Sequence, residues 1–310
     1  MNYATFKLNF RTAVHFGDGG VLDSAGTSFL ADTLFSALYI ESLKLNLNDQ
    51  LLSYVKEGKL VFSDAFPFKD NQYFLPKPMK HVEGRDAGNS TEKKLLKKIK
   101  YIPCDMIDRF LKSEADLKEL SKFSFYKLSE DTKVSIRNEK NSESDGEPKP
   151  YRVGVCTFND NCGLYVVVGY ENDDIFGFIK SVFESLQYTG IGGKRASGLG
   201  RFELSIDKNS QYLQRLLNRQ SDTYMTISVS YPQDDELDNA LEQASYNIVK
   251  RSGFVLSDTY AQEHRRKLNK FLFASGSCFK NKFTGTILDV SANSGTHPVY
   301  RYAFPMFIGV

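Results

Sequence analysis

Residues 174–206 read DIFGFIKSVFESLQYTGIGGKRASGLGRFELSI, and this stretch joins three structural signals without a gap. Apolar residues recur at helical spacing from Ile175 to Leu186. Gly190 follows and stands where a helix C-cap glycine belongs. After the glycines, RFELSI has the composition of a strand. The stretch therefore predicts a helix, a loop that carries a Lys-Arg pair, and a strand.

The glycine-rich segment does not match the nucleotide-binding motifs that contain similar residues. A P-loop has the pattern G-x-x-x-x-G-K-[ST], but here Arg195 follows Lys194, and the position five before Gly193 is Tyr188. The Rossmann pattern G-x-G-x-x-G begins at Gly190 and fails at its sixth position, which is Arg195. Both motifs also precede a helix, whereas this segment precedes a predicted strand.

The segment does have the residue types that contact a nucleic-acid backbone. Glycines lack a Cβ, so their backbone N–H groups can approach a phosphate closely. Lysine and arginine neutralise phosphate charge, and a serine hydroxyl can donate to a phosphate oxygen. The alternatives are an ordinary connection with solvated basic side chains and, for Arg201, a structural pair with an acidic residue. We expect RNA contacts from Gly190, Gly192, Gly193, Lys194, Arg195, Ser197, Gly198, Gly200 and Arg201.

The composition is that of a soluble globular protein without a general affinity for polyanions. The chain has 310 residues, 41% hydrophobic and 25% charged, and a net charge of +2, so any nucleic-acid site must be a local patch. The length predicts two domains. Four cysteines form no CxxC and no metal-ligand ladder, which is typical of reduced thiols in the cytoplasm. We expect neither a signal peptide nor a membrane span.

The order of local signals predicts an α+β fold. The first half begins with an expected strand at 3–10, a glycine-rich loop at 15–28, a helix from about 29 to 45 capped by Ser28, and a strand in 59–68. An exposed polar insertion at 79–100 and helical structure in 102–122 should follow. We then expect a polar loop at 138–150 and a hairpin of strands at 151–158 and 162–170.

This order predicts two ferredoxin-like (RRM-like) domains. The first would cover 1–210, with insertions near 79–122 and 138–150 and the glycine-rich loop between its last helix and last strand. From about residue 221, DTYMTISVSYP, YNIVKRSGFV, KFLFASGSCF and VYRYAFPMFI predict a β-rich second domain over 221–310 with one short helix. The strand-poor stretch 207–221 is the expected boundary.

GIGGKRASGLGRF resembles the glycine-rich loop of the RAMP superfamily, the RNA-binding proteins of CRISPR systems. Three more stretches are similar to that superfamily: FRTAVHFG…FLADTLFSALY, IVKRSGFV, and KVSIRNEKNSESDGEPKPYRVGVCTF, which keeps only Ile136-Arg137 of the IDR-T-G signature seen in other RAMPs. The resemblance extends over nearly the whole chain. Because a full β-rich half follows the loop, the chain most resembles the RAMP subunit at the foot of type III-A (Csm) CRISPR effector complexes.

This resemblance implies a non-catalytic, cytoplasmic scaffold without a metal, a cofactor or a membrane contact. It would clamp the 5′ handle of the CRISPR RNA (crRNA), dock the large cyclase- or polymerase-like signature subunit, and contact a backbone RAMP subunit. On this basis His15, Arg137 and Arg251 join the expected RNA contacts. The alternatives are a hydrogen bond to its own loop for His15 and a surface salt bridge for Arg251. Phe254 could stack on a base, with a core position as its alternative.

Two other functions stay open at this point. A RAMP endoribonuclease that processes precursor crRNA would use a histidine after the first strand, here His15, as general base. An unrelated enzyme could bind a small nucleotide in the glycine-rich loop. HExxH, GxSxG and zinc-deaminase motifs do not occur in the sequence.

Overall fold

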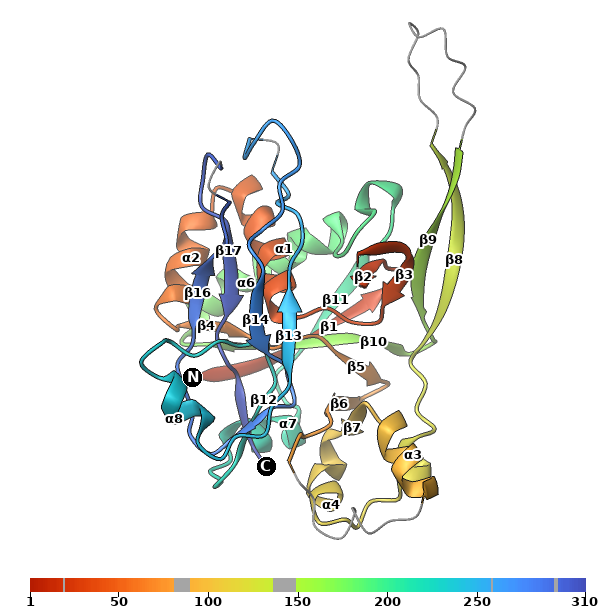
Figure 1. Ribbon diagram of the computed structural model, residues 1–310, viewed down its shortest axis with the longest axis vertical. Helices are drawn as coiled ribbons and strands as arrows, with labels where there is room; N and C mark the ends of the chain where they lie inside the picture. The colour runs from red at the N-terminus through yellow and green to blue at the C-terminus, as the bar shows by residue number, and fades with distance from the viewer. Residues whose placement is uncertain (19, 81–89, 136–148, 258, 293–294) are drawn as a thin grey trace, which may run out of the picture.

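The computed structural model describes residues 1–310 apart from 19, 81–89, 136–148, 258 and 293–294 (Figure 1). The first part of the chain contains β1 (Asn2–Phe10), β2 (Phe16–Asp18), β3 (Val21–Gly26), α1 (Ala31–Lys44), α2 (Asn48–Lys56), β4 (Leu60–Phe62), β5 (Phe66–Lys69), β6 (Gln72–Pro76), α3 (Ser90–Lys98), β7 (Tyr101–Pro103), η1 (Cys104–Met106), α4 (Ile107–Leu111), α5 (Leu117–Leu120), β8 (Tyr126–Ser135), β9 (Lys149–Phe158), β10 (Cys162–Tyr170), α6 (Asp173–Thr189), η2 (Arg195–Ser197) and β11 (Phe202–Asp207). The remainder contains α7 (Gln211–Asn218), β12 (Tyr224–Thr226), α8 (Leu237–Leu241), β13 (Ile248–Arg251), β14 (Lys270–Phe273), β15 (Cys278–Phe279), β16 (Thr286–Asp289), β17 (Tyr300–Ala303) and β18 (Phe307–Gly309).

A seven-stranded sheet forms the centre of the first part. Its strands follow the order β11–β1–β10–β5–β6–β7, and β4 also pairs with β10. β1 lies antiparallel between β11 and β10, with Leu8 opposite Leu204 on one side and Leu164 on the other. The alternation predicted for 3–10 is confirmed in part: Phe6 and Leu8 are fully buried, but Thr5, expected on the polar face, is buried as well.

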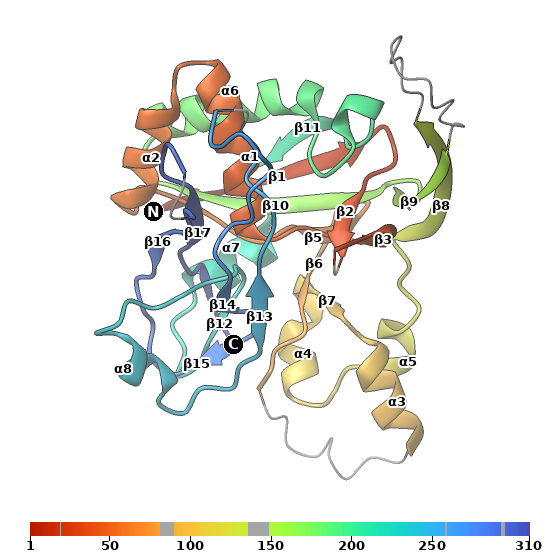
Figure 2. The same ribbon diagram turned by 45° about the horizontal axis from the view of Figure 1, so that its top comes forward.

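β10 is apolar on both faces because each face of the sheet is covered. Val166 and Val168 pack in one cluster with α1 and α6, whereas Tyr165 and Val167 pack in another with α4, α7 and β12. In Figure 2, α1 and α6 lie above β1 and β10, and α7, β12 and α4 lie below. A strand buried on both faces is a continuous apolar run, as CGLYVVVGY is.

The predicted hairpin of 151–158 with 162–170 is wrong. β9 pairs with β8 over its whole length, while β10 enters the central sheet beside β1 and β5. The chain does turn between them, but Asn161 has a φ of 59° and the turn leads into a different sheet. β8 and β9 form a ribbon that projects from the body (Figure 1), and the polar loop expected at 138–150 lies almost entirely outside the described residues.

The first helix begins two residues later than predicted, and Ser28 does not cap it. The Ser28 hydroxyl donates to the carbonyl of Ala65. Asp64 caps the helix instead, because its Oδ1 accepts from the backbone N–H of Ala31 at 2.7 Å. The same oxygen accepts from the N–H of Val229 at 2.9 Å. Asp64 thus ties α1 to a segment 165 residues further along, which no local signal reveals.

The predicted β-rich character of the second part is confirmed. β12 pairs with β15 and β18, β13 with β14, and β16 with β17, and α8 is the predicted short helix. The expected boundary at 207–221 contains α7. β17 packs against α1, and Tyr302 and Phe304 join the core beneath that helix. The two parts of the chain therefore share a core.

The glycine-rich segment leaves α6 at Gly190, as predicted, and is held by the residues that follow β1. The N–H of Gly193 donates to the carbonyl of His15 at 2.8 Å, and the N–H of Gly200 donates to that of Ala13 at 2.9 Å. The loop predicted before the first helix contains the short hairpin β2–β3. Backbone contacts thus fix the segment at both ends.

We predict that Gly200→Ala destabilises the protein more than Gly198→Ala. Both residues are left-handed, with φ of 80° and 84°, so alanine costs about 1–2 kcal/mol at either position. A Cβ at Gly200 would lie 2.1 Å from the carbonyl oxygen of Ile191, whereas at Gly198 nothing lies within 4 Å. Urea unfolding measures the difference, which we expect to exceed about 2 kcal/mol. Equal losses would show that the loop relaxes around the new methyl group.

A second prediction concerns the pH dependence of stability. Burial raises the pKa of Asp64 to about 6, against hydrogen bonds from Val229 and Ala31 that lower it. The folded state therefore binds this proton more tightly than the unfolded chain, whose pKa is about 4, and stability is lost as the pH rises from about 4 to 6. The free energy of unfolding of Asp64→Asn relative to the wild type, measured with urea, should therefore increase by about 1–1.5 kcal/mol when the pH is raised from 5 to 7.5.

Asp32→Asn is the matched control for this prediction. Burial alone would raise the pKa of Asp32, but Arg251 and Arg301 hold it below its usual value. Its stabilisation is therefore present above about pH 4 and is lost only at lower pH. The variant should lose about 3–5 kcal/mol at pH 5 and at pH 7.5 alike. An Asp64→Asn effect that is equally flat would contradict the raised pKa.

Candidate nucleic-acid interface

In the part of the chain that the structure describes, three basic side chains of the glycine-rich segment have no carboxylate partner. Lys194 has a left-handed backbone, with φ of 58°, and its Nζ lies 5.0 Å from the ring centre of Tyr151 on β9. Within the described residues, neither Lys194 nor Arg195 nor Arg201 forms an ion pair; the acidic neighbour Glu203 pairs with Arg11 instead. Three cations on one short segment are thus available to an anionic ligand.

The glycines shape this segment as the sequence predicts. Gly190, Gly192, Gly198 and Gly200 all have positive φ. Ser197 is exposed at the end of the short turn η2. The segment therefore bends repeatedly while its basic and hydroxyl side chains stay accessible.

His15 lies beneath the segment. It is buried, and its Nδ1 is 2.7 Å from the carbonyl of Gly154 on β9. A Cβ on Gly193 would approach the imidazole Cδ2 to 2.8 Å. The histidine therefore supports the loop and connects it to the β8–β9 ribbon. Arg137, expected at the root of the polar loop 138–150, lies outside the described residues.

A cavity of about 770 Å³ opens beside the glycine-rich segment. Its walls come from α1, from residues 191–195 and from the second part of the chain around 251–267 and 297–300. Apolar side chains line part of it. The charged side chains that line it are all basic: Lys44, Arg195, Arg251 and Lys267, with no Asp or Glu among the lining residues described.

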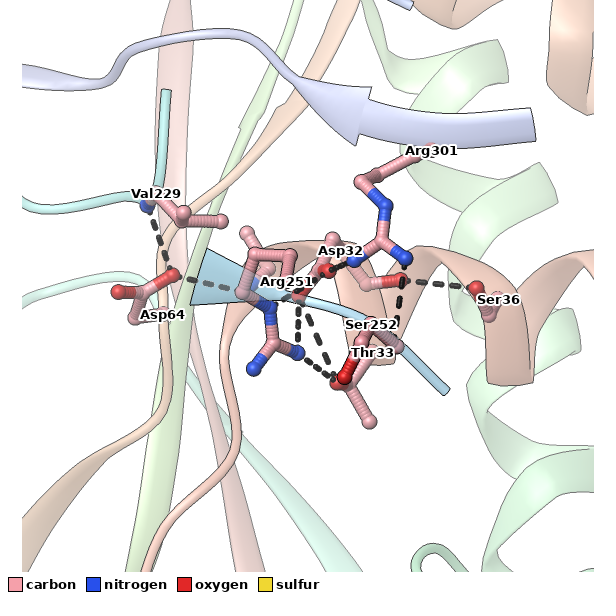
Figure 3. Close-up of polar contacts among 9 residues, drawn as sticks. Asp32, Thr33, Ser36, Asp64, Val229, Arg251, Ser252 and Arg301 are labelled. Atoms are coloured by element: carbon pink, nitrogen blue, oxygen red, sulfur yellow. Dashed lines mark hydrogen bonds and ion pairs between the residues drawn. The ribbon is translucent and has the colours of Figure 1, made fainter. Parts of the chain in front are cut away.

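Arg251, an expected RNA contact, lies at this cavity and binds a buried carboxylate. Its Nε and Nη2 donate to the two oxygens of Asp32 at 2.9 and 2.8 Å, and Nη2 also donates to the hydroxyl of Thr33 (Figure 3). Arg301 donates to Asp32 from another side, at 2.7 Å. Asp32 is only 4% exposed. Two arginines thus share one carboxylate of α1.

Lys267 adds a third cation to this cluster. Burial lowers its pKa, and the charges of Arg301 and Arg251 lower it further, while Asp32 opposes them. Three basic groups around one carboxylate leave a formal excess of two positive charges when Lys267 is protonated. A phosphate in the cavity would compensate that excess, because an anion favours the charged form of each neighbour.

Sequence reasoning identified Arg195 and Arg251 but missed Asp32, Lys267 and Arg301. Asp32 looks like an ordinary acidic residue in the first turn of a helix. Arg301 interrupts the apolar strand VYRYAFPMF, and a charge inside an apolar run indicates a buried partner. That partner is 269 residues away, so the sequence could signal the need for a pair without identifying it.

Other kinds of site are not found in the part of the chain that the structure describes. No group of three or more His, Cys, Asp or Glu side chains there is placed to hold a metal ion. Within the same residues, no helix is both long and apolar enough to cross a bilayer. All four cysteines are buried and unpaired.

Relatives with similar sequences carry a common name. A Mycobacterium tuberculosis protein named "CRISPR system Cms protein Csm4" is 38% identical and aligns over 100% of this chain and 98% of its own length. A Streptococcus thermophilus protein of the same name is 34% identical over 99% and 98% of the two chains.

Two solved structures share the fold over nearly the full length. A chain of a "Csm3-Csm4 subcomplex in the type III-A CRISPR-Cas interference complex" has a TM-score of 0.66 at 20% identity and covers 100% of this chain and 99% of its own. A chain of a "Csm1-Csm4 cassette in complex with cA4" has a TM-score of 0.62 at 18% identity, with coverage of 99% and 97%.

Two family sequence patterns divide the chain between them. The RAMP superfamily pattern matches residues 7–203, and that of the CRISPR Csm4 C-terminal domain matches residues 219–310. The first match contains the glycine-rich segment, and the second contains Arg251, Lys267 and Arg301. The chain therefore belongs to the RAMP superfamily and, within it, to the Csm4 family.

Proposed function

We propose that this chain is a non-catalytic, RNA-binding subunit of a type III-A CRISPR interference complex, where it clamps the 5′ handle of the crRNA in antiviral defence. The cavity beside the glycine-rich segment carries the proposal. It is large, at about 770 Å³, and its charged lining is entirely basic in the described residues. A basic cavity next to a flexible backbone suits the phosphates of a bent RNA strand.

The expected contacts divide into phosphate contacts and base contacts. Arg195, Arg251 and Lys267 line the cavity and would bind phosphates, with Lys194 at its approach. The apolar lining, including Val255 and Tyr300, would receive a base. The remaining contacts stay predictions: Gly190, Gly192, Gly193, Ser197, Gly198, Gly200, Arg201, His15 and Arg137.

We infer two ferredoxin-like units, 1–210 and 221–310. In the first, β1, α1, β4, β10, α6 and β11 follow the order strand, helix, strand, strand, helix, strand, and the sheet runs β11–β1–β10–β4. That order agrees with the ferredoxin-like arrangement. The ranges matched by the two family patterns, 7–203 and 219–310, support the boundary.

The subunit would dock two proteins in the cytoplasm. Solved chains with this fold come from assemblies named for Csm3 and for Csm1. We infer that this chain contacts a backbone RAMP subunit of the Csm3 kind and a large signature subunit of the Csm1 kind. Purification of the tagged protein from its native host, with sequencing of bound RNA, tests this. RNAs that share one 5′ handle and co-purify with both subunits are expected; RNA-free protein would refute the proposal.

The geometry around His15 favours a scaffold over an endoribonuclease. A general base must come within hydrogen-bond reach of the proton it removes. His15 is buried and already bonded to Gly154 through Nδ1. It therefore has little access to a ribose hydroxyl, and we assign it to the support of the loop.

We predict that Lys194→Ala/Arg195→Ala weakens binding of the guide RNA to a similar degree for all handle sequences. If each side chain neutralises one phosphate, the plot of log K against log salt becomes shallower by about 0.7 per lost contact on single-stranded RNA. Filter binding at several salt concentrations measures this slope.

Lys180→Ala/Lys280→Ala is the control for the loss of two charges. Both lysines are exposed and lie near surface carboxylates, Glu184 and Glu242. We expect this pair to leave the slope unchanged. If the two double variants behave alike, the glycine-rich segment does not contact the RNA.

A further inference from the structure

Positive charge is concentrated in two segments, 246–256 and 265–273, which we call the basic ribbon. Together they contain six Lys or Arg residues and no Asp or Glu. The whole chain has a net charge of only +2, so the rest of the chain is net negative. Charge of this density on one structural element is typical of a nucleic-acid site.

The basic ribbon is antiparallel and has two faces. β13 and β14 lie side by side (Figure 1), with Val249 opposite Leu272 and Lys250 opposite Phe271. Because side chains alternate along a strand, the Val249 pair faces inward and the Lys250 pair faces outward. The ribbon continues beyond the strands through a bridge between Phe254 and Arg266.

The outer face combines exposed aromatic rings with cations. Phe254 is 55% and Phe271 59% exposed, and these two are the most exposed phenylalanines of the described residues. The Arg266 guanidinium lies 5.0 Å from the ring centre of Phe254. Lys250 is the cross-strand neighbour of Phe271. Each ring therefore presents its surface to solvent with a positive charge beside it.

The ribbon also reaches the cavity described above. Arg251, Val255, Leu256 and Lys267 all belong to the ribbon and line the cavity. Leu256 is at the same time 62% exposed, so it lies at the rim. A strand of RNA that leaves the cavity over this rim would next meet Phe254, two residues away in the chain.

We propose that the outer face of the basic ribbon is a stacking platform for a single-stranded segment of the guide RNA that continues from the cavity. Bases would stack on Phe254 and Phe271, while Lys250 and Arg266 would neutralise the adjoining phosphates. Stacking on aromatic side chains beside a basic groove is how single strands are held without base-specific hydrogen bonds. This inference rests on the proposed RNA-binding function.

The charge pattern favours RNA over a protein partner. Protein interfaces are depleted in lysine at their centres, whereas here Lys250 lies directly opposite the exposed Phe271. The ribbon does expose aliphatic side chains, Ile248 and Leu268, which a protein could also cover. The experiment below separates the two occupants.

The test uses the full chain and the guide RNA recovered with it, resynthesised with 2-aminopurine in place of single handle adenines. We expect Phe254→Ala/Phe271→Ala to lower affinity about 10- to 100-fold without a change in the salt slope. Quenching of 2-aminopurine on binding should be lost at the positions that stack. Phe254→Leu/Phe271→Leu keeps apolar side chains and removes the rings, and should reproduce the loss of quenching.

Tyr212→Ala is the matched control. Tyr212 is also an exposed ring with a cation beside it, because Arg215 lies 5.7 Å from its centre, but it is on α7. We expect this variant to bind RNA with wild-type affinity and quenching. Lys250→Gln/Arg266→Gln should instead make the salt slope shallower by about 0.7 per contact.

The outcomes distinguish a failure of the stacking platform from a failure of the proposed RNA-binding function. If the phenylalanine variants bind and quench normally while Lys194→Ala/Arg195→Ala still weakens binding, the platform is wrong and the proposed function stands. If neither set of variants affects RNA binding, both fail. If the phenylalanine variants bind RNA normally but no longer retain a protein subunit in the purified complex, the ribbon is a protein-docking surface and the inference is overturned.

Discussion

Asp32 binds two arginines from the far part of the chain, and the geometry of the cavity depends on this contact. Arg251 lies on β13 and Arg301 on β17, and both donate to a carboxylate that is almost fully buried on α1. If the carboxylate were removed, two cations would remain together in a poorly solvated place. The contact therefore fixes where the second part of the chain meets the first.

The place where the two parts of the chain meet carries an excess of positive charge. Asp32 paired with Arg251 alone would carry no net charge, but Arg301 and Lys267 add two cations around the same carboxylate. Arg195 approaches from the glycine-rich segment and lines the same cavity. The two parts of the chain thus contribute positive charge to a space that neither encloses alone. An anionic ligand held there would bind more tightly to the joined molecule than to either part.

Local signals predicted the elements well and the long-range contacts poorly. The helix, the glycine C-cap and the strand predicted in 174–206 are confirmed. The spacing of apolar residues and the backbone freedom of glycine determine these elements within a few residues of the chain. Strands do form at 151–158 and 162–170, but the predicted pairing between them is wrong, because β9 pairs with β8. The cap of α1 likewise comes from Asp64 rather than Ser28. Such choices are decided by tertiary packing, which the sequence pattern does not encode locally.

The basic ribbon shows how one buried contact can set the chemistry of an exposed face. Side chains on a strand alternate, so a shift of one residue exchanges the inner and outer sets. Arg251 must face inward because it binds Asp32, and its neighbour Lys250 must then face outward beside Phe271. The register of the ribbon therefore depends on an ion pair on its opposite side. The carboxylate of Asp32, by binding Arg251, thereby helps to keep Lys250 and Phe271 on the outer face.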